Sequence, residues 1–196
     1  MSVLVAALSV LVQSTPLDTE FMEDRSVELA VRREVYGIRA RRSRDAEDYV
    51  EDRLDRGQWA STRRFHVSAE AYFAEERGTC SLDGVFVSAE AVVELPYWTG
   101  LPDASDRATG RWNAFFSGIV DHESAHLDIA MAGLTRIRDD LEALPPAGTC
   151  EDLDASIQST VRDGRDWIDR NQRDYDDVTG HGQNEVAGAA WQPLED

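Results

Sequence analysis

Two histidines four positions apart enclose a glutamate in the segment His122-Glu123-Ser124-Ala125-His126. On a helix this spacing places both imidazoles on one face, where they can share a metal ion. Neutral imidazole is a good zinc ligand, and a catalytic zinc takes three protein ligands and a water molecule. Glu123 lies beside the first ligand, where its carboxylate can take a proton from that water. The motif predicts a zinc-dependent hydrolase, with His122 and His126 as ligands of Zn2+ and Glu123 as general base.

The third zinc ligand has to come from outside this motif. The long metzincin motif needs a histidine at position 132, where this chain has Ala132, so that class is excluded. We predict His181 as the third ligand, because a neutral imidazole suits zinc and the flanking glycines at 180 and 182 let the backbone turn tightly. The same reasoning leaves three alternatives open, namely Asp176, Glu151 and Asp154.

Other polar and aromatic residues have less specific interpretations. Tyr175 has the chemistry to hydrogen-bond a developing oxyanion, and Asp176 to orient a ligand imidazole, but a structural role explains each equally well. His66 falls on the polar face of a predicted strand, where we expect it in solvent. Trp112 and Trp167 occur at helical spacing and are expected in the core.

The elements that must position these residues divide the chain into two halves. The first half predicts a strand over 28–38, a helix over 43–56 and a hairpin of two alternating segments, 65–73 and 85–93. The second half predicts a long amphipathic helix over 106–144 that carries the histidine motif and ends at two prolines. A further helix is expected from Cys150 through Trp167, and the segment 175–182 is predicted to be a loop.

These segments predict the α+β class, with a small antiparallel or mixed sheet in the N-terminal half packed on long helices in the C-terminal half.

Residues 2–12 are almost wholly apolar and too short to span a bilayer. We interpret residues 1–19 as a signal peptide, although no Lys or Arg precedes the run; a buried N-terminal strand is the alternative. A single domain over 20–196 is expected to follow, with no stable membrane insertion of the mature chain.

The net charge limits the possible partners, and the two cysteines bear on the compartment. With 38 acidic and 20 basic residues the formal charge is -18, which disfavours nucleic acid, because phosphate binding requires clustered Lys and Arg. Cys80 and Cys150 are too far apart in sequence for a CxxC metal knuckle. In an exported chain they are expected to form a disulfide, whereas in a cytosolic chain both would be small buried hydrophobes.

Several short segments together resemble a known family. They are Gly78-Thr79-Cys80, Leu95-Pro96-Tyr97-Trp98, the stretch from Trp112 to His126, Cys150, and Tyr175-Asp176-x-x-Thr179-x-His181-Gly182. Their order over roughly residues 25 to 190 resembles the bacterial family of predicted secreted zinc-dependent proteases, catalogued as a domain of unknown function. The resemblance implies a zincin-like α+β fold, an extracytoplasmic location (periplasmic or secreted), zinc at His122 and His126, and Glu123 as base.

The leading hypothesis is a metalloendopeptidase whose substrate is a peptide or protein. The strand over 85–95 is expected to hold an extended substrate by edge pairing. Two alternatives remain: a zinc amidase of cell-wall peptides, and a non-catalytic, metal-stabilised binding protein.

Overall fold

The computed structural model describes residues 20–24, 26–42, 45–46, 49 and 61–181. The predicted signal peptide, 1–19, and most of the predicted helix over 43–56 lie outside the described residues. Within the described part, none of the helices combines the length and the apolar character that crossing a bilayer requires.

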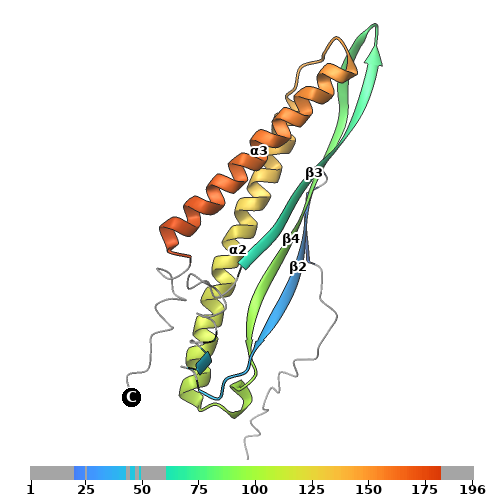
Figure 1. Cartoon of the computed structure of the whole chain (residues 1–196). Helices are drawn as coiled ribbons and strands as arrows, with labels where there is room; N and C mark the ends of the chain where they lie inside the picture. The colour runs from blue at the N-terminus through green and yellow to red at the C-terminus, as the bar shows by residue number, and fades with distance from the viewer. Residues whose placement is uncertain (1–19, 25, 43–44, 47–48, 50–60, 182–196) are drawn as a thin grey trace, which may run out of the picture.

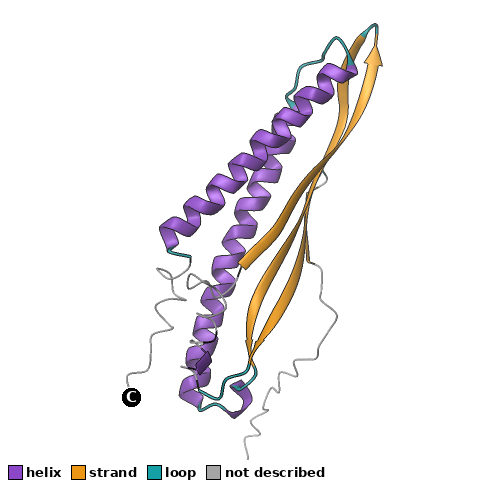
Figure 2. Ribbon diagram, viewed as in Figure 1, coloured by secondary structure: helices purple, strands orange, loops and turns teal. Residues whose placement is uncertain are grey.

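Four strands form one mixed sheet in the N-terminal half. Figure 1 labels three of them, β2, β3 and β4, and Figure 2 draws the strands in orange. They are β1 (Glu20–Asp24), β2 (Val27–Ile38), β3 (Ser61–Glu76) and β4 (Thr79–Trp98), in the spatial order β1-β2-β4-β3. β2 runs parallel to β4, whereas β1 is antiparallel to β2 and β3 is antiparallel to β4. The predicted strand, hairpin and α+β class are therefore confirmed.

The β3–β4 hairpin turns through two residues of positive φ, Arg77 at 52° and Gly78 at 78°. Such a pair matches the right-handed twist of the strands that flank it, and glycine adopts positive φ without steric cost.

β4 pairs along one edge with β2 and along the other with β3. The prediction that the segment 85–95 offers a free edge is therefore wrong, because an internal strand already has its main-chain groups paired.

Two long helices follow a short 3-10 turn, η1 (Leu101–Asp103): α2 (Asp106–Glu142) and α3 (Cys150–Thr179). Their first turns are capped by the side chains of Ser105 and Thr149, which accept hydrogen bonds from the backbone N–H of Ala108 and Asp152. Both helices lie on the same face of the sheet (Figures 1 and 2).

The core lies between this helix pair and the sheet. Alternate strand residues point into it, as the period of two requires, and meet apolar residues of both helices. Its members include Leu29, Val31, Val87, Ala89, Phe115, Leu134, Ile137 and Ile168. Trp112 belongs to this core as predicted, whereas Trp167 is only half-buried at its border.

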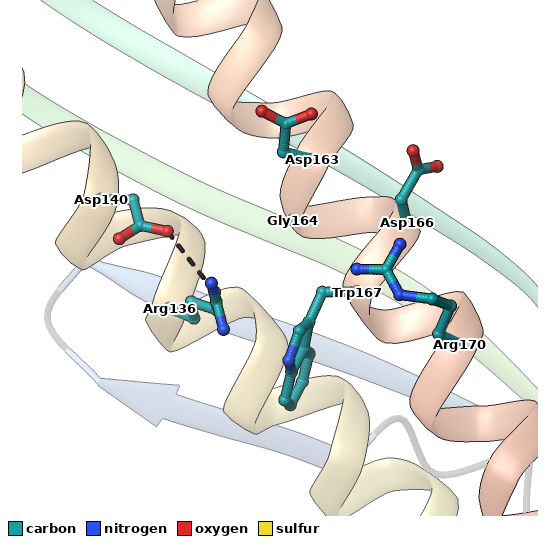
Figure 3. A pocket seen from close by; sticks show the side chains of 7 residues that line it. All are labelled: Arg136, Asp140, Asp163, Gly164, Asp166, Trp167 and Arg170. Atoms are coloured by element: carbon teal, nitrogen blue, oxygen red, sulfur yellow. Dashed lines mark ion pairs between the residues drawn. The ribbon is translucent and has the colours of Figure 1, made fainter.

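The two helices approach closely at a reciprocal pair of glycines. A Cβ atom added at Gly133 of α2 would lie 2.1 Å from Cγ1 of Ile168, and one added at Gly164 of α3 would lie 2.1 Å from Cγ1 of Ile137. Each glycine therefore leaves the space that an isoleucine of the other helix fills. Gly164 and Trp167 line a pocket of about 220 Å3, and Cζ of Arg136 lies 5.6 Å from the centroid of the Trp167 ring. Figure 3 shows the side chains that line this pocket.

A disulfide between Cys80 and Cys150 joins the start of β4 to the start of α3. Reciprocal backbone hydrogen bonds of 2.9 and 2.8 Å between Cys80 and Ala147 hold the same junction. The end of the sheet that carries the hairpin turn is thus fastened to the segment between the helices.

α3 continues further than predicted. Residues 175–179 form its last turns, so the prediction of a loop over 175–182 is wrong for this part. The helix ends where Gly180 adopts the left-handed conformation, with φ 59° and ψ 43°, and the backbone N–H groups of Gly180 and His181 both donate to the carbonyl oxygen of Asp176. The apolar period fades here because the inward face of these turns carries polar side chains.

Candidate metal centre

Three side chains from α2 and α3 bring their ligand atoms together. His122 and His126 project from the middle of α2, and Asp176 projects from the last turns of α3. The two Nε2 atoms lie 3.2 Å apart, and Oδ1 of Asp176 lies 3.4 Å from Nε2 of His122 and 3.1 Å from Nε2 of His126. Both histidines are buried, whereas the Asp176 side chain is 26% exposed.

The size of this triangle suits a small metal ion. Ligands of a tetrahedral zinc with bonds of about 2.0–2.1 Å stand about 3.3–3.4 Å from one another. The three separations of 3.1, 3.2 and 3.4 Å are close to that spacing. Two imidazoles and one carboxylate are also a donor set of catalytic zinc sites. These three residues could therefore hold a metal ion.

Gln172, one turn before Asp176 on α3, fixes the orientation of the His126 ring. Its amide nitrogen donates to the backbone oxygen of His126 at 2.8 Å, so its amide oxygen faces Nδ1 of His126 as a hydrogen-bond acceptor. Nδ1 therefore carries a hydrogen, and in the neutral ring the lone pair lies on Nε2, the atom that faces the other two ligand atoms. Partners of this kind set the tautomer of metal-binding histidines.

Tyr175 packs against both histidines. Its ring is stacked on His122, with centroids 5.0 Å apart and an interplanar angle of 21°, and it meets His126 edge to face at 5.1 Å. These contacts restrict both imidazoles to the orientation in which their Nε2 atoms converge. They support the structural interpretation of Tyr175.

Glu123 is buried next to the cluster, with 4% of its surface exposed. Its Oε2 accepts a hydrogen bond of 2.6 Å from the hydroxyl of Thr62, the second residue of β3. Burial raises the pKa of Glu123, against the opposing effects of this hydrogen bond and of the two histidines. A raised pKa makes the carboxylate a better proton acceptor, as a general base requires.

The pKa values of Asp176 and His126 are shifted in opposite directions. Burial acts to raise the pKa of Asp176, but hydrogen bonds from His122 and His126 outweigh it and hold this pKa well below its usual range. Burial acts to lower the pKa of His126, but its hydrogen bonds to Asp176 and Gln172 raise it above the ordinary value. The carboxylate of Asp176 is therefore ionised at neutral pH and can bind a cation.

His181 lies beside this cluster but is not one of its three members. Its Nδ1 is 3.4 Å from Oδ1 of Asp176, and its backbone has a φ of 55°. Of the candidates for the third ligand, the structure thus brings Asp176 to the two histidines and places His181 next to Asp176. The other two candidates, Glu151 and Asp154, lie exposed in the first turns of α3.

Sequence reasoning missed two residues of the centre. Thr62 comes from a distant strand, and no local pattern signals its contact with Glu123. Gln172 lies four residues before Asp176, a spacing that would have drawn attention to both had the helix been extended to that point. His66 is exposed on β3, as predicted.

Comparison with curated proteins and with solved structures gives no match. A family model does match, over residues 34–182, a range that contains the whole candidate metal centre. The chain therefore belongs to the family described as "Bacterial protein of unknown function (DUF922)".

Proposed function

We propose that this protein is a zinc-dependent hydrolase of peptide bonds, with zinc held by His122, His126 and Asp176. The observation that carries the proposal is the triangle of ligand atoms with separations of 3.1–3.4 Å beside the buried carboxylate of Glu123. A helical pair of histidines that flanks a glutamate, placed under a sheet, supports a zincin-like arrangement. The disulfide supports an extracytoplasmic location, because such bonds persist in oxidising compartments.

The roles of the side chains follow from their positions. A bound zinc ion supplies Lewis acidity that polarises a substrate carbonyl and lowers the pKa of a water molecule to about 7. Glu123 accepts the proton of the attacking water and then passes it to the nitrogen of the leaving amine. Thr62 holds one carboxylate oxygen of Glu123, which leaves the other oxygen for the proton. Gln172 and Tyr175 keep the two imidazoles converged.

Replacement of the proposed base tests this function. We expect zinc-loaded wild-type protein to cleave casein or a peptide library, and Glu123→Gln to lower kcat/KM by about 100-fold or more while it keeps the same zinc content. Glu142→Gln is the matched control, since it makes the same chemical change at an exposed position of the same helix.

The outcomes separate this proposal from its rivals. Cleavage of cell-wall peptides but of no protein substrate would favour an amidase. Stoichiometric zinc without hydrolysis of any peptide or amide would favour a metal-stabilised binding protein. Equal activity of the wild type and Glu123→Gln would sink the assignment of the base.

A further inference from the structure

β3 offers an edge that starts at the metal centre. It pairs with β4 on one side, and among the described strands none pairs with its other side. Thr62, at its beginning, contacts Glu123. From there the edge runs toward the hairpin turn, over about 36 Å as far as Phe73. An unpaired strand edge presents a row of main-chain N–H and C=O groups to which another extended chain can bond.

A groove lies beside this edge, between β3 and α3. It consists of two cavities of about 320 and 430 Å3 that share the lining residues Val67, Arg162 and Arg165. The strand supplies alternate apolar or small side chains to the groove, at Phe65, Val67, Ala69, Ala71 and Phe73, and Ser68 also lines it. Since an added strand also alternates its side chains, every second residue would meet this wall.

The helix wall of the groove carries two arginines in its middle. Arg162 and Arg165 are three residues apart on α3, and both line both cavities. In the part of the chain that the structure describes, neither forms an ion pair or a hydrogen bond. Two such arginines are notable in a chain with a formal charge of -18. A guanidinium without a partner binds a carboxylate by charge-assisted hydrogen bonds.

Acidic residues limit where a carboxylate can be accepted. Asp154 lies toward the hairpin end of the groove, whereas Asp166 and Asp169 line the cavity nearer the metal centre together with the two arginines and follow them by four residues on α3. These carboxylates repel an anion on either side of Arg162 and Arg165, so the two guanidinium groups are the place in the groove where a carboxylate is favoured. The charges therefore suit a chain with one acidic side chain in the centre of its bound segment.

We propose that this groove binds an extended segment of the polypeptide substrate, added as a strand to β3, with an acidic side chain held by Arg162 and Arg165. The proposal rests on the peptidase function and adds a substrate class to it. The two arginines precede Asp176 by 11 and 14 residues, or about 16–21 Å along the helix. On an extended chain this corresponds to about five to six residues between the acidic side chain and the cleaved bond.

Binding to an inactive variant tests the groove without hydrolysis. The probe is a fluorescein-labelled 14-residue peptide of alternating valine and serine with one central glutamate, measured by anisotropy with zinc-loaded, full-length Glu123→Gln. We expect it to bind about 10-fold more tightly than the same peptide with a central lysine. Arg162→Ala/Arg165→Ala should remove that preference, and alternate N-methylation of the peptide backbone should weaken binding about 10-fold or more.

The matched control is Arg170→Ala/Arg173→Ala, which makes the same charge change at the same spacing on α3. These arginines line neither cavity of the groove, so the preference for glutamate should persist. Equal affinity for the two peptides, an equal loss in the control variant, or no effect of N-methylation would overturn the proposal.

A peptide-cleavage assay distinguishes failure of the groove proposal from failure of the peptidase proposal. Wild-type protein should cleave peptides with glutamate five or six residues from the scissile bond about 10-fold more efficiently than peptides with glutamate two residues away, chiefly through KM. If hydrolysis depends on Glu123 but not on the two arginines, the groove proposal alone is contradicted. If the glutamate peptide binds as expected but no peptide is cleaved, the peptidase proposal fails and the groove is supported as a binding site.

Discussion

Asp176 and His181 are adjacent candidates for the third ligand, and substitution distinguishes them. Oδ1 of Asp176 lies 3.4 and 3.1 Å from the Nε2 atoms of His122 and His126, and Nδ1 of His181 lies 3.4 Å from the same Oδ1. We expect Asp176→Ala to weaken zinc binding by more than about 100-fold, and His181→Ala to change it by less than about 10-fold. Competition with a chromophoric chelator measures both affinities. The reverse order would make His181 the ligand and Asp176 its orienting partner.

The pH dependence of zinc binding follows from the imidazoles. Zinc binds only neutral imidazole, so the metal-free protein holds more protons than the complex and zinc affinity must rise with pH. Because the pKa of His126 is raised, protons compete with zinc for this imidazole at pH values above about 6.5, the ordinary pKa of histidine. The increase in Tm caused by zinc should be full at pH 8 and shrink steadily toward pH 5.

His66→Ala is the control for this titration, because His66 is an exposed histidine outside the centre. It should leave the pH profile unchanged. A zinc-induced increase in Tm that is constant between pH 8 and pH 5 would show that the ligands are not histidines.

The histidine motif was predictable because its chemistry lies within five consecutive residues. His122, Glu123 and His126 share one turn of helix, so sequence spacing alone places them together. The third ligand depends on how α3 packs against α2, which spacing does not reveal. The sequence predicts His181 as the third ligand and leaves Asp176 as an alternative, because spacing does not show that α3 continues through Thr179 and brings Asp176 to the two histidines.

At the scale of elements, the contact between α2 and α3 sets the position of Asp176. The contact depends on Gly133 and Gly164, each of which makes room for an isoleucine of the other helix. Any displacement of α3 along α2 would separate Asp176 from the two histidines. The glycines therefore connect helix packing to the geometry of the metal centre.

Glycine-to-alanine substitutions test this connection. Gly133→Ala and Gly164→Ala each place a methyl group 2.1 Å from an isoleucine carbon, and each should lower the free energy of unfolding by about 1–3 kcal/mol. Gly110→Ala is the matched control in α2, because an added Cβ there meets nothing within 4 Å. It should raise the free energy of unfolding by about 0.5–1 kcal/mol. Urea unfolding measures all three, and similar changes at the three positions would contradict the close approach.

Element prediction succeeded where apolar periodicity was strong. The two alternating segments gave the β3–β4 hairpin, and α2 was found almost to its ends because apolar residues and a double proline define it. The helical conformation of residues 175–179 was not predicted, because the side chains that these residues turn toward the metal centre are polar and give no apolar period. The internal position of β4 could not be predicted either, because strand order depends on the parallel pairing with β2.

At the scale of the whole molecule, the disulfide and the metal centre lie at opposite ends of α3. Cys150 begins the helix and Asp176 lies 26 residues later, a distance of about 39 Å. One cross-link fastens the hairpin to the helix, and the other, if a metal binds, fastens the two helices to each other. The two are expected to act independently.

Removal of the disulfide tests this independence. The bond closes a sequence separation of 70 residues, and Cys80→Ala/Cys150→Ala should lower the free energy of unfolding by about 4 kcal/mol. Zinc affinity should stay within about 3-fold of the wild-type value. Urea unfolding and chelator competition measure the two effects. Loss of zinc affinity in proportion to loss of stability would show that the two ends are coupled.

The proposed metal centre holds a single zinc ion through two imidazoles and one carboxylate. X-ray absorption at the zinc edge, recorded on the one-to-one complex, reports these ligands. We expect four nitrogen and oxygen neighbours at about 2.0–2.1 Å, two of them from imidazole, and the same spectrum for His181→Ala. Failure to bind zinc at one equivalent, or a third imidazole that disappears in His181→Ala, would contradict it.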